Sequence, residues 1–254
     1  MAKFDYRDPA GDPASPALPE SRPALPYVVP LFAFLLVMLP GSFGELGGIN
    51  WETFWKQHHP ELYAAKTILA AILLWYFWPS YTPIRWSKLS LGALIGIVGT
   101  FLWIGTELAA RKVGLALPVN PADIYNPDQM LGGGWQETAY LCIRVAGPSL
   151  VVPVMEELFF RDFLMRLLVS WNRRVNFQEI PVGTFTWGSL LAMSVVFGLN
   201  HGIQRFFFAG FVYGLVMGLL LIRTKSLGAC IVAHGVTNFT LYLYVIYTGD
   251  WQWM

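Results

Sequence analysis

Three short polar motifs interrupt apolar segments in the second half of the chain. They are Glu156-Glu157-x3-Arg161, Phe197-x3-His201 and His234-x3-Asn238. An Asp, Lys or Arg at the centre of a membrane helix costs about 2.5 to 3.5 kcal/mol on insertion scales, so ionisable residues kept in such segments are functional candidates. The motifs therefore predict a site that combines carboxylate, guanidinium, imidazole and carboxamide groups.

The first motif contains two carboxylates that helix geometry separates. Glu157 and Arg161 are four residues apart, about 40° from each other on a helix, whereas Glu156 lies about 140° from Arg161. A paired carboxylate is held ionised, but an unpaired one in apolar surroundings can accept and donate a proton. We expect Glu157 to be structural and Glu156 to be chemical. The alternative is a salt-bridged helix end with Glu156 in solvent.

The other two motifs place histidines in apolar sequence. Phe197 lies one turn before His201 and is positioned to pack against its imidazole. His234 and Asn238 share a helix face, and both can direct hydrogen-bond donors to one point, as an oxyanion requires. Each histidine alone could be a satisfied core residue. Three such motifs in three separate segments favour one shared site.

The composition indicates a membrane protein. The chain has 254 residues, of which 55% are hydrophobic and 13% are charged, and its mean hydropathy is +0.48. Soluble domains carry about 25% charged residues. A net charge of +1 provides no field that attracts polyanions, so nucleic acid is not an expected partner. Cys142 and Cys230 lie in apolar runs, which argues against a disulfide framework.

The apolar segments predict an all-α, polytopic transmembrane bundle of about seven to eight spans. Residues 1–26 are proline-rich and are expected to form a disordered tail, and residues 27–250 are expected to form the transmembrane domain. Glycines spaced as Gly210-x3-Gly214-x3-Gly218 predict close helix packing. The seven expected spans are 27–40, 62–78, 89–109, 135–158, 185–200, 206–222 and 227–247, with an eighth if 165–171 forms a separate interfacial helix.

The distribution of Lys and Arg predicts the orientation. These residues are more frequent in the segments on the side of the N-terminus, so the N-terminus is predicted to be cytoplasmic, in the inner membrane if the chain is bacterial. With seven spans the C-terminus lies outside. In this topology His201 ends an inside-to-outside span, and its depth relative to Glu156 and His234 is left open.

At the three motifs the sequence resembles the CPBP (Abi) family of intramembrane proteases. This family includes CAAX prenyl endopeptidases of the Rce1 type and bacteriocin-processing or immunity proteins. Its pattern is Glu-Glu-x3-Arg, then Phe-x3-His, then His-x3-Asn, and the chain has the same order. The resemblance covers residues 135–247, the expected protease-like core.

The resemblance implies hydrolysis of a peptide bond. Glu156 and His201 would hold and activate the attacking water, while His234 and Asn238 would stabilise the tetrahedral oxyanion. The residues that would support the site structurally are Glu157, Arg161 and Phe197.

A metal ion is the alternative to a carboxylate base. Glu156, His201 and His234 could ligate Zn²⁺ in an open catalytic site. However, the sequence lacks the His-Glu-x2-His helix of ordinary zinc proteases, and an unpaired glutamate needs no metal. The prediction is therefore that no cofactor is used.

Three functions fit these observations. The leading one is an intramembrane endopeptidase whose partners are the bilayer and a protein or peptide substrate, with or without a lipid modification. The second is a non-catalytic membrane binding or immunity protein that keeps the same bundle. The third is a small transporter that uses Glu156, Arg161 and His201 as a proton or solute path, although no inverted repeat supports it.

Overall fold

The computed structural model describes residues 24–38, 45–46, 49–121, 124–171 and 175–253. The predicted tail lies mostly outside this range, because residues 1–23 are not among the described residues. The first helix begins at Leu25, two residues before the predicted start of the transmembrane domain.

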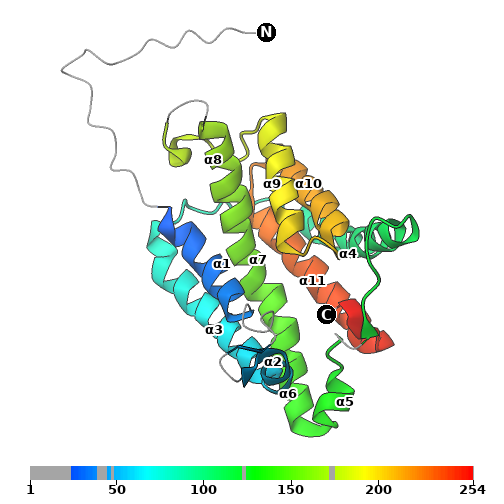
Figure 1. Cartoon of the computed structure of the whole chain (residues 1–254). Coiled ribbons are helices and arrows are strands. Elements are labelled where there is room, and N and C mark those ends of the chain that lie inside the picture. The colour runs from blue at the N-terminus through cyan, green and yellow to red at the C-terminus, as the bar shows by residue number, and fades with distance from the viewer. Residues whose placement is uncertain (1–23, 39–44, 47–48, 122–123, 172–174, 254) are drawn as a thin grey trace, which may run out of the picture.

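The described chain is a bundle of α-helices (Figure 1), which confirms the all-α prediction. The main helices outside the long central one are α1 (Leu25–Met38), α3 (His59–Phe77), α4 (Leu89–Lys112), α9 (Trp187–Asn200), α10 (Phe207–Thr224) and α11 (Leu227–Thr248). The short elements are the antiparallel pair β1 (Glu45–Leu46) and β2 (Ile49–Asn50), the helices α2 (Trp51–Gln57) and α5 (Pro127–Leu131), and the 3₁₀ turns η2 (Trp78–Ser80), η6 (Phe177–Glu179) and η7 (Trp251–Trp253).

Five helices of the described chain are long and apolar enough to cross a membrane, so the protein is an integral membrane protein. They are His59–Ser80, Leu89–Lys112, Gly134–Ser170, Phe207–Thr224 and Leu227–Thr248. Helices α1 and α9 are shorter. The 14 residues of α9 extend only about 21 Å, less than the roughly 30 Å of a hydrocarbon core, so the expected full span at 185–200 is wrong.

The central helix runs without a break from Gly134 to Ser170. The alternative of a separate interfacial helix at 165–171 is therefore excluded, because α8 continues the same helix. Two of its stretches have the wider turns of a π-helix. Such turns are rare in proteins, and those that occur are often at functional sites. Pro148 lies inside the first stretch and Pro153 follows it; neither has an N–H to donate. The successive parts are α6 (Gly134–Ala146), η4 (Gly147–Val151), α7 (Val152–Glu157), η5 (Leu158–Leu164) and α8 (Met165–Ser170).

Helices α4 and α11 run parallel and touch through glycines. A Cβ atom added to Gly96 would lie 2.5 Å from the carbonyl oxygen of Ala233. Gly92 and Gly99 make equally close approaches to α11 one turn to either side. The Thr237 hydroxyl, on α11, donates to the Gly96 carbonyl at 2.8 Å. Close backbone contact of this kind is a common mode of helix association in membranes, and here it fixes the position of α11.

Replacing Gly96 by alanine is expected to destabilise the fold by about 1–3 kcal/mol, because the added methyl group forces α4 and α11 apart. Gly105→Ala is the matched control, since nothing lies within 4 Å of a Cβ added there on the same helix. The control should keep or slightly raise stability, as alanine is the better helix former. Thermal unfolding in one detergent checks both variants. Equal melting temperatures for the two would contradict the packing argument.

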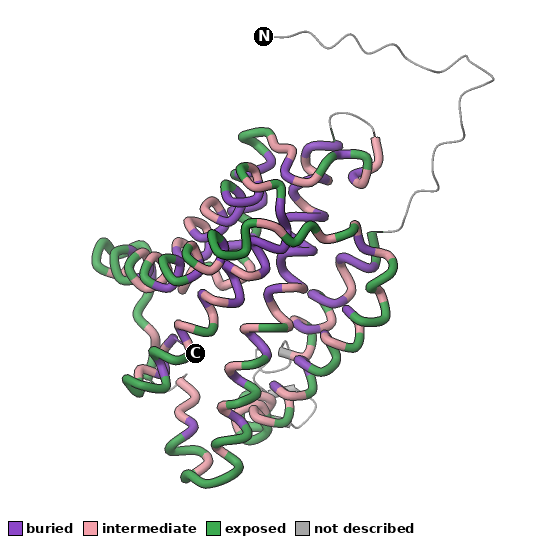
Figure 2. The backbone as a smooth tube through the Cα atoms, turned by 180° about the vertical axis from the view of Figure 1, so that it is seen from behind, coloured by how far each residue is buried: buried purple, intermediate pink, exposed green. Residues whose placement is uncertain are grey.

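Helices α9 and α10 form an antiparallel hairpin whose turn, residues 201–206, lies part-way along the length of the bundle (Figure 1). The predicted glycine row packs here, with Gly210 against Gly198 and Gly214 against Ser194. The turn is fixed at Phe206, whose φ of 59° is left-handed and whose N–H donates to the buried Glu107 carboxylate of α4 at 3.1 Å. Buried positions gather around this hairpin, whereas α5 and α6 are mostly exposed (Figure 2). The hairpin therefore places residue 201 among the other helices.

Candidate active site

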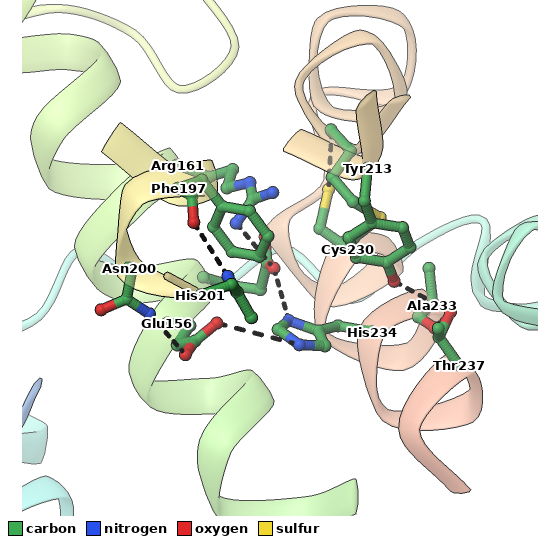
Figure 3. A network of polar contacts seen from close by, with 12 residues as sticks. Glu156, Arg161, Phe197, Asn200, His201, Tyr213, Cys230, Ala233, His234 and Thr237 are labelled. Atoms are coloured by element: carbon green, nitrogen blue, oxygen red, sulfur yellow. Dashed lines mark hydrogen bonds and ion pairs between the residues drawn. The ribbon is translucent and has the colours of Figure 1, made fainter. Parts of the chain in front are cut away.

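The structure brings the three polar motifs to one cavity of about 340 Å³. Glu156 comes from α7, His201 follows α9, and His234 comes from α11, so three elements far apart in sequence converge (Figure 3). This convergence answers the question of depth: His201 lies with the other two because α9 ends part-way along the bundle. The predicted site residues that line the cavity are Glu156, Phe197, His201, His234 and Asn238.

The predicted ion pair between Glu157 and Arg161 is present. Arg161 Nη1 lies 3.2 Å from Glu157 Oε1, and both side chains are fully buried. The same carboxylate oxygen lies 2.9 Å from His234 Nδ1, a contact that helix spacing does not predict. The ring of Phe197 covers the guanidinium, with its centroid 4.3 Å from Arg161 Cζ. Glu157 and Arg161 thus form a buried support behind His234.

The contact with Glu157 sets the orientation of the His234 ring. A carboxylate accepts hydrogen bonds, so His234 Nδ1 carries a proton and Nε2 is directed to the cavity. Nε2 lies 3.9 Å from Glu156 Oε2, which is too long for a direct hydrogen bond. Glu156 is 5% exposed, and its Oε2 has no hydrogen-bond partner among the described residues. The two atoms therefore face each other across a gap in the cavity.

His201 is held by the end of its own helix. Its Nδ1 donates to the carbonyl of Phe197 at 2.8 Å, which leaves Nε2 as a hydrogen-bond acceptor in the neutral ring. The predicted packing of Phe197 against His201 is confirmed, with ring centroids 4.6 Å apart. Trp103 of α4 packs edge-on against the same imidazole at 5.0 Å. The ring is thus positioned by both the hairpin and α4.

Asn238 is partly occupied by the backbone of the central helix. Its Nδ2 donates to the carbonyl of Pro148 at 2.8 Å. That carbonyl is available because the Val152 N–H bonds to Gly147 instead, as π geometry requires, and Pro153 has no N–H. One N–H of the Asn238 amide is therefore committed, and one remains for the expected oxyanion role.

Asn200 was not among the predicted site residues. Its Nδ2 donates to Glu156 Oε1 at 3.3 Å, so it holds the carboxylate from the side opposite His234 (Figure 3). The signal for it in the sequence is a second carboxamide directly before His201 at the end of an apolar helix.

The residues named as an alternative zinc set do not form a ligand cluster in this arrangement. In the part of the chain that the structure describes, no three His, Cys, Asp or Glu side chains are grouped so that they could hold a metal ion. His201 and His234 each commit Nδ1 to a neighbour, which leaves one nitrogen apiece.

One comparison with known proteins matches the part of the chain that contains the three motifs. Residues 138–240 match the family model of Rce1-like, type II CAAX prenyl endopeptidases, and this range contains all three motifs. Neither curated proteins nor solved structures gave a match. The segment that contains all the predicted site residues is therefore similar to the Rce1-like family, which is described as a family of endopeptidases.

Proposed function

We propose that this protein is an intramembrane endopeptidase in which Glu156 activates a water molecule for attack on a peptide bond. One observation carries the proposal: the buried Glu156 Oε2, which has no hydrogen-bond partner in the described part of the chain, faces the cavity that His201 and His234 also line. A water molecule in this cavity can bind to that oxygen. The family match supports the reaction class.

The geometry suggests a role for each group. Glu156 Oε2 and His201 Nε2 are acceptors, so together they would orient both protons of one water and direct its lone pair at the substrate carbonyl. Glu156 takes a proton as the C–O bond forms. It then gives that proton to the leaving amine as the C–N bond breaks. Glu156 therefore ends the reaction as the carboxylate with which it began.

The oxyanion needs donors, and His234 with Asn238 would supply them. His234 donates from Nε2 when both of its ring nitrogens carry protons. Glu157 orients the ring for this role, because its carboxylate accepts from Nδ1 at 2.9 Å.

The orientation proposed from the positive charges has the N-terminus in the cytoplasm. The start of α1 and the loop before α4 are in contact, because the Tyr81 hydroxyl donates to the backbone carbonyl of Pro26 at 2.9 Å. The start of α11 lies beside them, because the hydroxyl of Ser226 donates to the backbone carbonyl of Arg85 at 2.8 Å. Lys and Arg gather at cytoplasmic ends. The basic residues at this end of the bundle include Arg85, Lys88, Arg223 and Lys225.

The proposed function is tested by peptide hydrolysis with purified protein in detergent. A peptide library whose products are identified by mass spectrometry should reveal cleavage by the wild type. His201→Ala should slow it about a hundredfold, because the water loses one of its two acceptors. Gly105→Ala, which alters no contact, should cleave like the wild type. Cleavage by His201→Ala at the wild-type rate would contradict the proposed mechanism, and absence of cleavage by the wild type would favour a binding or immunity function.

A further inference from the structure

Two buried cations line the cavity that contains Glu156. Lys66 of α3 is 4% exposed and Arg144 of α6 is 8% exposed. Both charged groups lie against the ring of Tyr63, with Lys66 Nζ at 4.5 Å and Arg144 Cζ at 4.3 Å from its centroid. Of the described residues that line this cavity, Glu156 is the one acidic residue. The cavity therefore has a positively charged end as well as a carboxylate.

The charge of Arg144 is not matched inside the protein. In the part of the chain that the structure describes, no carboxylate lies within ion-pair distance of it. Its Nε has no hydrogen-bond partner there either. The rings of Tyr63 and Tyr242 offset part of the desolvation cost, but a buried cation usually has an anionic partner. The missing partner is expected to be a ligand.

The central helix connects this charge to the proposed catalytic carboxylate. Arg144, Pro148, Val152 and Glu156 follow each other at intervals of four residues, and all four line the cavity. In a regular α-helix each such interval turns by about 40°, so the series would wind away from one face. The π stretch between Arg144 and Val152 changes this rotation. A ligand along this face would contact both charges.

We propose that Lys66 and Arg144 form a carboxylate-binding subsite for the peptide substrate. This inference rests on the proposed endopeptidase function and adds a substrate class to it, namely peptides with a negative charge near the bond that is cleaved. A guanidinium matches a carboxylate through two parallel hydrogen bonds. The carboxylate is either the free C-terminus of the substrate or an Asp or Glu side chain.

Binding to the Glu156→Gln protein tests the subsite without requiring cleavage. The probe is one peptide library in three forms: with a free C-terminal carboxylate, with a C-terminal amide, and with the amide plus one internal Glu. Immobilised protein is incubated with each form, and retained peptides are counted by mass spectrometry. At least one carboxylate form should be retained about 10- to 100-fold better than the neutral amide.

The variants assign this preference to the two cations. Arg144→Gln and Lys66→Gln should each reduce it at least severalfold, whereas Arg223→Gln, which removes an exposed arginine, should leave it unchanged. A preference for the free C-terminus or for the internal Glu supports the subsite and identifies the source of the charge. Equal retention of all forms, or a preference that persists in both Gln variants, overturns it.

Further measurements distinguish a loss of binding from a loss of folding or of catalysis. Gel filtration and thermal unfolding report whether each variant is folded. If Arg144→Gln does not fold, retention is compared for Lys66→Gln and for the charge-conserving Arg144→Lys instead. Arg144→Lys should keep most of the preference for carboxylate peptides. Failure of the endopeptidase proposal would appear as cleavage unaffected by Glu156→Gln, while the binding measurement would still report on Lys66 and Arg144.

Discussion

Glu156→Gln is expected to lower peptide hydrolysis by about 10⁴-fold while the protein remains folded. Glutamine has nearly the same shape, and its Oε1 can still accept the hydrogen bond that Asn200 now donates at 3.3 Å. Its amide cannot take a proton from water, so the general base is lost. Initial rates for one cleaved peptide, at equal concentrations of folded protein, provide the measurement.

Two further variants sharpen this test. Glu61→Gln neutralises an exposed carboxylate on α3 and should retain the wild-type rate. Glu156→Asp keeps a carboxylate but withdraws it by one methylene, so it should recover part of the activity that glutamine loses. A Glu156→Gln rate above one tenth of the wild-type rate would refute the role of Glu156 as the base.

Arg161→Gln is expected to destabilise the fold by about 3–5 kcal/mol, because it leaves the carboxylate of Glu157 buried without its cation. Glu157 and Arg161 are fully buried and 3.2 Å apart. The double variant Glu157→Gln/Arg161→Gln removes both charges, so it should be more stable than the Arg161 single variant. The free energy of unfolding in mixed micelles, measured for a complete double-mutant cycle, checks this.

The matched control is Lys56→Gln, which breaks an exposed ion pair with Glu52 at the same helical spacing. Exposed pairs contribute about 0–1 kcal/mol, so that variant should be almost neutral. Additive effects of the Glu157 and Arg161 substitutions would mean that the buried pair is not coupled.

The helices were predictable from the apolar segments, but the role of α9 was not. Residues 187–200 are as apolar as a span, so hydropathy alone suggests a crossing. The helix ends at Asn200, just before Gly202 with its φ of 112°, and the turn that follows is held by Phe206, whose N–H donates to the buried Glu107 of α4, 99 residues away in sequence. A contact of that range leaves no local pattern. The position of the α9–α10 turn, and hence the depth of His201, therefore could not be predicted from the sequence.

The contacts in the site also differ in whether the sequence could predict them. The pair Glu157–Arg161 lies within one helix, so its spacing predicts it. The bond from His234 to Glu157 and the bond from Asn200 to Glu156 join different helices, which periodicity does not report. The occupied amide of Asn238 depends on a π turn in a third element. The catalytic roles of Glu156, His201, His234 and Asn238 remain predictions that the variants above can test.

If Lys66 and Arg144 bind the substrate as proposed, the central helix would also set a distance along the substrate. Arg144 and Glu156 are twelve residues apart on it, which corresponds to at most about 18 Å along the axis. An extended peptide covers this length in about five residues. A substrate whose carboxylate is bound at Arg144 would therefore be cut no more than about five residues from that charge. If that charge is the free C-terminus, the helix would set the length of the released fragment.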